Sequence, residues 1–263
     1  MFFDLSVLCS VLALLHITLY FFLGYGRLVT ITNMFAVLGL IFASGQFITL
    51  YSVAHANPFG SFSGLMLFLA QALLLAYLLL YFKFKRPSIG LFIFPIALIY
   101  ILGARFTGHL VPLHNPHAAS MWLYIHLPFT IIGTAFFMVS TFIGIMYFVQ
   151  ERQLKNKNFG VIFRRFPPLE TIDRLLTTTL YIGFYTFTIG LLAGLVWMLY
   201  ASGRINFFSP KLVFAIITWI IYSSIIFYKK FKGMSPKDTA LSTIIGFISV
   251  LVTYIGVAIF VMG

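Results

Sequence analysis

Cysteine is nearly absent from this chain of 263 residues, which has only Cys9. A disulfide framework, a CxxC redox pair and a thiolate metal site all need more than one cysteine. The sequence therefore excludes these three features as the basis of stability or chemistry.

Charged residues are also scarce, at 8% of the chain, whereas hydrophobic residues make up 61%. A soluble domain of this length needs far more charge on its surface. Only five residues are acidic, and none of them forms a recognisable pair with a histidine. We therefore expect a membrane protein that is not an enzyme and has no catalytic residues.

The chain contains long apolar runs. A helix needs roughly 18 or more apolar residues to cross about 30 Å of hydrocarbon. Because no backbone group in the bilayer can go unpaired, we expect each such run to be a helix. The eight runs cover about residues 4–24, 31–52, 62–82, 88–105, 121–149, 176–200, 210–228 and 240–261.

These runs predict an all-α fold, a polytopic membrane bundle of about eight transmembrane helices, with residues 1–263 forming a single integral membrane domain. The first run is too long, and its amino end too poor in cations, for a signal peptide. The largest connection, about 150–175, is too short for a core of its own. We expect its second half, from Pro167, to begin a helix at the membrane surface.

The cations indicate topology rather than a nucleic-acid partner, although the net charge is +12. Most of the 17 lysines and arginines fall on alternate connections, and the other connections hold only Arg105, Arg204 and Lys211. By the positive-inside rule, both termini then lie outside the cytoplasm. The expected location is the cell (inner) membrane, and the expected partner of the basic side is the lipid bilayer.

The stretch 190–222 is the most informative, since it places a short aromatic loop between two apolar runs. The loop begins with Gly203-Arg204 and ends with Pro210-Lys211, and Thr218-Trp219-Ile220-Ile221-Tyr222 follows. This pattern resembles the tryptophan-rich loop of the CcsA/CcmC/HemX family of cytochrome c assembly membrane proteins. In that family the loop reads roughly W-G-x-Y-W-x-W-D-P-K-E and forms an extracytoplasmic haem platform.

Other segments resemble the same family. Gln150-Glu151-Arg152-Gln153-Leu154-Lys155 is similar to its Q-E-R-x-L-K run, and Trp122-Leu123-Tyr124-Ile125-His126 is similar to its W-L-x-x-H. The resemblance covers about residues 121–257, and before residue 121 only the pattern of spans fits. It is greatest to the short eight-span members, the HemX-like and YpjD-like proteins.

The loop departs from the family pattern in its tryptophans and acids. Asn206 stands where a tryptophan is expected, and Ser209 and Leu212 stand where the family has acidic residues. The family also has a histidine after the loop, whereas His126 is the last histidine here. Ligation by two histidines that flank the loop is therefore excluded.

The resemblance implies haem as a transient cofactor and His126 as a candidate ligand, with a hydrogen-bonded helix histidine as the alternative. His16, in the first run, is a candidate because a buried imidazole needs a partner, which a neighbouring helix can also supply. Phe207 and Phe208 are candidates for a haem wall or for membrane-surface anchors. Arg204 and Lys211, together with Arg105, are cations that can pair with haem propionates.

Four further histidines fall on the outer side, at or near the ends of spans, but carry no ligand assignment. They are His55, His109, His114 and His117. Pro116 disfavours a helix between the last two, so a solvated loop is preferred to a metal pair, and no metal site is expected. Gly183, Gly190 and Gly194 share one helix face and predict close helix packing.

The resemblance implies a membrane protein of cytochrome c assembly that handles haem at the extracytoplasmic face. It would pass haem to other cytochrome c biogenesis membrane proteins, which must also manage the thiols of the apocytochrome. One alternative is an accessory or regulatory protein of haem biosynthesis, as HemX-like relatives are. Another is a transporter or a scaffold that binds no haem, although the spans offer few charges for ion coupling.

Overall fold

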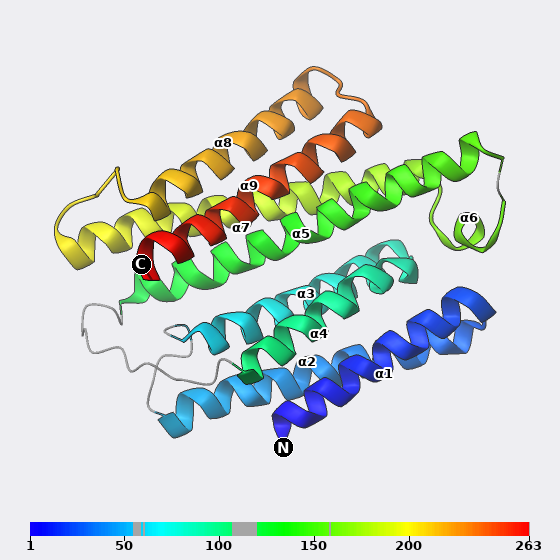
Figure 1. The fold of residues 1–263 in the computed structure, drawn as a ribbon, viewed down its shortest axis with the longest axis horizontal. Coiled ribbons are helices and arrows are strands. Elements are labelled where there is room, and N and C mark those ends of the chain that lie inside the picture. The colour runs from blue at the N-terminus through cyan, green and yellow to red at the C-terminus, as the bar shows by residue number, and fades with distance from the viewer. Residues whose placement is uncertain (55–58, 60, 107–119, 158, 263) are drawn as a thin grey trace. The chain divides into compact units, whose positions relative to one another are not determined.

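The computed structural model describes residues 1–54, 59, 61–106, 120–157 and 159–262 (Figure 1). In this part of the chain all regular structure is helical. The elements are α1 (Phe2–Leu23), α2 (Gly26–Ala54), α3 (Phe62–Phe84), the 3-10 helix η2 (Pro87–Ile89), α4 (Gly90–Phe106), α5 (Met121–Lys155), α6 (Val161–Arg165), α7 (Leu169–Ser202), α8 (Pro210–Phe231) and α9 (Pro236–Met262).

Every apolar run expected to span the membrane lies largely within one of these helices. Within the described residues, seven helices are long and apolar enough to cross a bilayer, namely α1, α2, α3, α4 with η2, α5, α7 and α8. The eighth expected run, 240–261, lies in α9. The prediction of an all-α, multi-pass helical bundle is therefore confirmed, whereas the orientation of the termini stays a prediction.

The chain forms two compact units. Unit 1 consists of residues 1–119 and 158–167, and unit 2 of residues 120–157 and 168–263. The expectation of a single membrane domain stays a prediction.

In unit 1, α1 packs on α2 and α4, and α3 packs on α4 and α2. Its core includes Ala43, Leu67 and Ile101, which are almost completely buried. A polar pair joins two of its helices, since Tyr77 donates a hydrogen bond from its hydroxyl to Asn33 Oδ1 at 2.8 Å. The alanines of this core, Ala43, Ala70 and Ala104, are small enough to let the helices approach closely.

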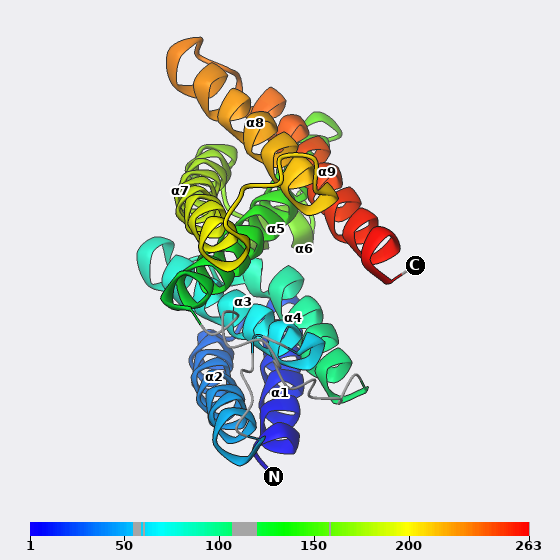
Figure 2. The same cartoon turned by 90° about the vertical axis from the view of Figure 1, so that its left-hand side faces the viewer.

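In unit 2, α5 packs along α7, and α8 and α9 lie side by side (Figures 1 and 2). The core of this unit centres on Phe137 and Tyr222, whose rings stack at 3.5 Å between centroids and 10° between planes. Phe187 packs against Phe137 with centroids 5.6 Å apart. These contacts tie α5, α7 and α8 together through one aromatic cluster.

Local signals set the helix ends in unit 2. The Ser120 side chain accepts a hydrogen bond from the Leu123 N–H and so caps the start of α5. As expected from Pro167 and Pro168, α7 begins at Leu169, with Glu170 in its first turn. It ends at Ser202, and the next residue, Gly203, caps it with a φ of 71°, a left-handed value that suits glycine.

One ion pair connects α7 to α8 at the end of unit 2 away from this glycine. Lys229 Nζ lies 2.7 Å from Asp173 Oδ1, and the two side chains are only 14% and 24% exposed. Lys229→Gln leaves this carboxylate partly buried without its partner, so we expect the free energy of unfolding in detergent to fall by about 2 kcal/mol.

The matched control for that variant is Lys155→Gln, which breaks the i,i+4 pair between Lys155 and Glu151. The lysine of this pair is 63% exposed. We expect its loss to change the free energy of unfolding by less than about 0.5 kcal/mol. Equal effects of the two substitutions in denaturant titrations would show that the pair of Lys229 and Asp173 has no special role.

Candidate functional site

Glycines bring α5 and α7 into close contact along their length. A Cβ placed on Gly133 would lie 2.7 Å from the backbone nitrogen of Phe187, and one on Gly190 would lie 2.6 Å from that of Thr130. A Cβ on Gly183 would meet the Phe137 ring at 2.8 Å. The predicted close packing of the α7 glycines is thus confirmed, and the helix they face is α5.

His126 lies near the start of α5 and is held against α7. Its Nδ1 is 2.7 Å from the carbonyl oxygen of Gly190. Because a carbonyl only accepts hydrogen bonds, Nδ1 must be the donor, and in the neutral ring Nε2 then keeps its lone pair. The hydrogen-bonded helix histidine that the sequence allowed is therefore present, and its Nε2 is in the form that binds a metal.

The last glycine of the α7 stripe makes room for this ring. A Cβ on Gly194 would lie 2.6 Å from His126 Nδ1 and 2.7 Å from its Cε1. The Thr130 hydroxyl, one turn further along α5, donates to the His126 carbonyl oxygen at 2.7 Å. The position of the imidazole thus depends on a backbone carbonyl, and on the absence of a side chain at residue 194.

The ring of Trp197 lies beside the imidazole of His126. Its ring is nearly parallel to the imidazole, with 6.4 Å between centroids and 7° between planes. Its Nε1 is buried and has no hydrogen-bond partner among the described residues. Trp197 lies three residues after Gly194, so the two residues share one face of α7.

The loop between α7 and α8 is a compact turn built around Asn206. Its side-chain oxygen accepts a hydrogen bond from the Phe208 N–H at 3.1 Å, and its carbonyl oxygen accepts one from the Ser209 N–H at 3.1 Å. This is the local bonding that makes asparagine a turn residue. Asn206 therefore has a structural role in this loop.

The structure brings most of the predicted site residues to one end of unit 2. The loop between α7 and α8 lies at the same end as the start of α5 (Figure 1). Phe207 is 60% exposed and Phe208 92%. Arg204 and Lys211 are exposed too. In the described part of the chain, no hydrogen bond or ring contact joins these four side chains to His126.

His16 and Arg105 belong to unit 1. His16 Nδ1 is 2.7 Å from the Leu12 carbonyl oxygen, one turn earlier in α1, and its ring centroid is 5.5 Å from that of Phe35. Arg105 lies 3.8 Å from Asp4 Oδ1 and over the Phe3 ring at 4.9 Å. Arg105 therefore already has partners within its own unit.

The remaining histidines lie outside the described residues, namely His55, His109, His114 and His117. Among the residues that are described, no three of the His, Cys, Asp and Glu side chains come together in a way that could hold a metal ion. The absence of a protein metal site stays a prediction.

The seven helices of the described residues that are long and apolar enough to cross a bilayer define a multi-pass membrane protein. Comparison with known sequences then shows the family to which the protein belongs. Residues 59–263 match the family model of the cytochrome C assembly protein, and the chain belongs to this family.

Several similar proteins share one name. The chain is 26% identical over 260 residues to "Cytochrome c biogenesis protein CcsA" of Guillardia theta, and the alignment covers 90% of this chain and 82% of the relative. It is 27% identical to the protein of that name from Mesostigma viride, over 86% of this chain and 84% of the relative. The protein of that name from Prochlorococcus marinus (strain MIT 9303) is 25% identical, over 98% and 91%.

These matches identify a membrane protein of cytochrome c assembly, as the sequence indicated. They also extend the resemblance, because the family match begins at residue 59 and not near residue 121. The first half of the chain escaped detection because apolar spans without a distinctive loop look alike in any membrane protein. Closer kinship to the short HemX-like members stays a prediction.

Proposed function

We propose that this chain carries haem as a transient cargo at the end of unit 2 where α5 begins, and that His126 would hold the haem iron through Nε2. The observation behind this proposal is the 2.7 Å contact of His126 Nδ1 with the Gly190 carbonyl oxygen. Histidines that ligate metals almost always donate from the other ring nitrogen, which fixes the tautomer and the ring orientation. His126 has this arrangement.

The neighbouring loop provides the other chemical groups that haem requires. Phe207 and Phe208 offer exposed aromatic surface to the macrocycle. Arg204 and Lys211 offer exposed cations to the propionates, and arginine can make a bidentate pair with a carboxylate. We assign the ligand to His126 rather than to His16, because His126 belongs to unit 2 and lies at the helix end beside this loop.

The proposed role is that of a carrier, with no catalytic step. The groups around His126 are a backbone carbonyl, the Thr130 hydroxyl and the Trp197 ring, and none of them is a carboxylate that could serve as an acid or base. A bound haem supplies an iron atom that accepts the imidazole. The chain's own part is to orient that imidazole and to hold the propionates.

The partners in this proposal are other membrane proteins of cytochrome c biogenesis, which receive the haem and manage the thiols of the apocytochrome. The relatives named CcsA are, by that name, cytochrome c biogenesis proteins. The basic connections favour an inner (cell) membrane location with both termini outside the cytoplasm, so the haem end of unit 2 faces outward.

An accessory or regulatory role in haem biosynthesis is the second candidate function. It is favoured by the loop, where Asn206 forms a turn in place of a family tryptophan and Phe208 is 92% exposed. A loop of this kind offers less aromatic surface than the family pattern. On this alternative the protein keeps the scaffold but carries no haem.

The pairing of propionates with Arg204 and Lys211 gives a test that separates the two functions. We expect the purified wild type to bind haem about fivefold more tightly than haem dimethyl ester, which lacks the two negative charges. The double variant Arg204→Gln/Lys211→Gln should bind both compounds equally. The measurement is a spectroscopic titration in a neutral detergent.

The control is Lys83→Gln/Lys85→Gln, which removes two cations from unit 1 and should keep the preference for haem. Binding of neither compound by the wild type would favour the accessory role. A preference for haem that survives in the Arg204→Gln/Lys211→Gln variant would contradict the assignment of these cations to the propionates.

A further inference from the structure

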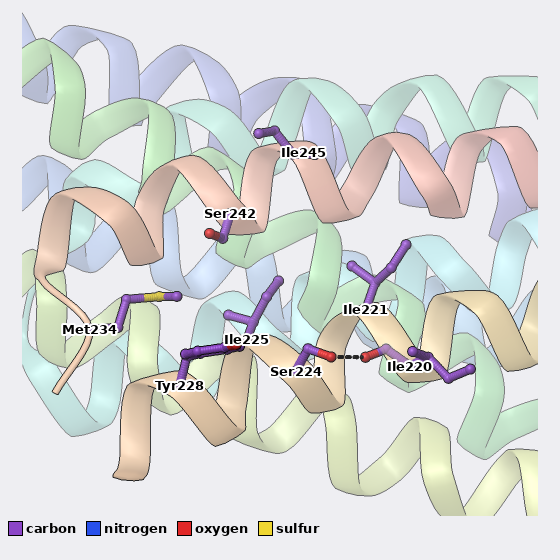
Figure 3. A pocket seen from close by; sticks show the side chains of 8 residues that line it. All are labelled: Ile220, Ile221, Ser224, Ile225, Tyr228, Met234, Ser242 and Ile245. Atoms are coloured by element: carbon purple, nitrogen blue, oxygen red, sulfur yellow. Dashed lines mark hydrogen bonds between the residues drawn. The ribbon is translucent and has the colours of Figure 1, made fainter. Parts of the chain in front are cut away.

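An open groove runs between α8 and α9 in unit 2 (Figure 3). Its volume is about 340 Å³, near the lower end of the roughly 300–1,000 Å³ of ligand pockets. Ile221 and Ile225 project from α8 toward α9, and Ile245 contributes from α9. From Ile220 to Tyr228 the groove follows α8 for about 12 Å at 1.5 Å per residue.

Polar atoms are few in this apolar groove. The Tyr228 hydroxyl and Ser242 Oγ line it, and neither makes a hydrogen bond within the described part of the chain. Ser224, by contrast, donates to the Ile220 carbonyl oxygen at 2.8 Å and is already satisfied (Figure 3). The groove thus presents two free hydroxyl groups beside its aliphatic side chains.

Lysines are frequent in the segment that follows Tyr228 and includes Met234, two residues that line one end of the groove. Lys230, Lys232 and Lys237 are exposed, and no acidic residue pairs with any of them among the described residues. Lys229 is different, because it pairs with Asp173 at 2.7 Å. The single acid in this connection, Asp238, accepts a hydrogen bond from the Ser235 hydroxyl at 2.7 Å. The connection therefore keeps an excess of positive charge.

We propose that this groove binds one phospholipid with an anionic headgroup. One acyl chain lies between α8 and α9 along Ile221 and Ile225, and the phosphate faces Lys230, Lys232 and Lys237. The free hydroxyls of Tyr228 and Ser242 donate to the glycerol ester oxygens. Basic pockets between membrane helices are a known setting for anionic headgroups, and charge complementarity selects this occupant.

The groove combines an apolar lining with positive charge at one end, and this combination favours a lipid over a soluble phosphate compound or a neutral lipid. A soluble phosphate compound would use the lysines but leave the apolar channel empty, and a neutral lipid would use the channel but leave the lysines unpaired. The groove also runs along α8, which is long and apolar enough to span a membrane and so lies where lipid chains are available. This inference stands independently of haem binding.

Native mass spectrometry of the wild type in a neutral detergent tests the proposal. Phosphatidylglycerol and phosphatidylcholine of matched chains are titrated separately, and glycerol phosphate provides the anion without chains. We expect one tightly bound phosphatidylglycerol, about tenfold or more preferred over phosphatidylcholine, and no binding of glycerol phosphate. Equal binding of the two lipids, or binding of glycerol phosphate, overturns the proposal.

Two variants separate the headgroup from the groove. Lys230→Gln/Lys232→Gln/Lys237→Gln should abolish the preference for phosphatidylglycerol, and Ser242→Phe should displace the chain and weaken binding about tenfold. Lys83→Gln/Lys85→Gln/Arg86→Gln, which removes three cations from unit 1, should change neither value. Affinity that is unchanged in Ser242→Phe, or a preference that is lost equally in the unit 1 variant, contradicts a site between α8 and α9.

Discussion

Replacing His126 by alanine is expected to weaken haem binding by at least about a hundredfold. Removing only the group that hydrogen-bonds to a metal-ligating histidine typically lowers the metal affinity roughly 10–100-fold, and this variant removes the ligand itself. His126 is also the last histidine of the chain, so no histidine beyond the loop can take its place. The measurement is a haem titration of purified protein, followed by the Soret band.

A second substitution distinguishes loss of the ligand from loss of the fold. His126→Gln keeps a side-chain N–H that can donate to the Gly190 carbonyl oxygen, but it has no imidazole. We expect a normal melting temperature and haem binding as weak as in His126→Ala. His16→Ala should bind haem within about twofold of the wild type. Unchanged affinity in His126→Gln would show that the iron is held elsewhere.

The substitution Gly194→Ala is expected to weaken haem binding by roughly 10–100-fold without removing any polar group. The new Cβ would lie 2.6 Å from His126 Nδ1, which is too close for the ring to stay in place. The imidazole must rotate away and break its hydrogen bond to Gly190, the interaction that fixes its tautomer. Haem titration and the position of the Soret band measure the effect.

Two other glycines provide controls for Gly194→Ala. Gly190→Ala places a Cβ against the backbone nitrogen of Thr130, so the helices themselves must separate, and we expect a loss of about 1–3 kcal/mol in the free energy of unfolding. A Cβ added at Gly26 would have no atom within 4 Å, and Gly26→Ala should have little effect. Haem affinity that is equal in Gly194→Ala and Gly26→Ala would contradict the role assigned to residue 194.

The helices were the most predictable part of the fold, because the bilayer admits few alternatives for a long apolar run. Their ends were less predictable. Helix α5 continues to Lys155 and α7 starts at Leu169, several residues beyond the apolar runs. Polar residues outside the hydrocarbon can extend a helix, as the pair of Glu151 and Lys155 does, but hydropathy does not detect them.

The candidate site was predictable only in part. The spacing of Trp122 and His126 identified the histidine, and the spacing of Gly190 and Gly194 predicted close packing. What fixes the imidazole is a carbonyl oxygen 64 residues away, and a backbone atom leaves no mark in the sequence. The parallel ring of Trp197 was missed for the same reason, since only the fold determines which helix it faces.

The measurement that tests the central claim most directly is the absorption spectrum of the wild-type protein, purified in detergent from haem-replete cells, in its oxidised and reduced forms. The proposed ligation by His126 predicts a Soret band in both forms and a sharpened band at longer wavelength after reduction. A colourless protein that also fails to take up added haem would contradict haem carriage, and would leave an accessory role in cytochrome c assembly.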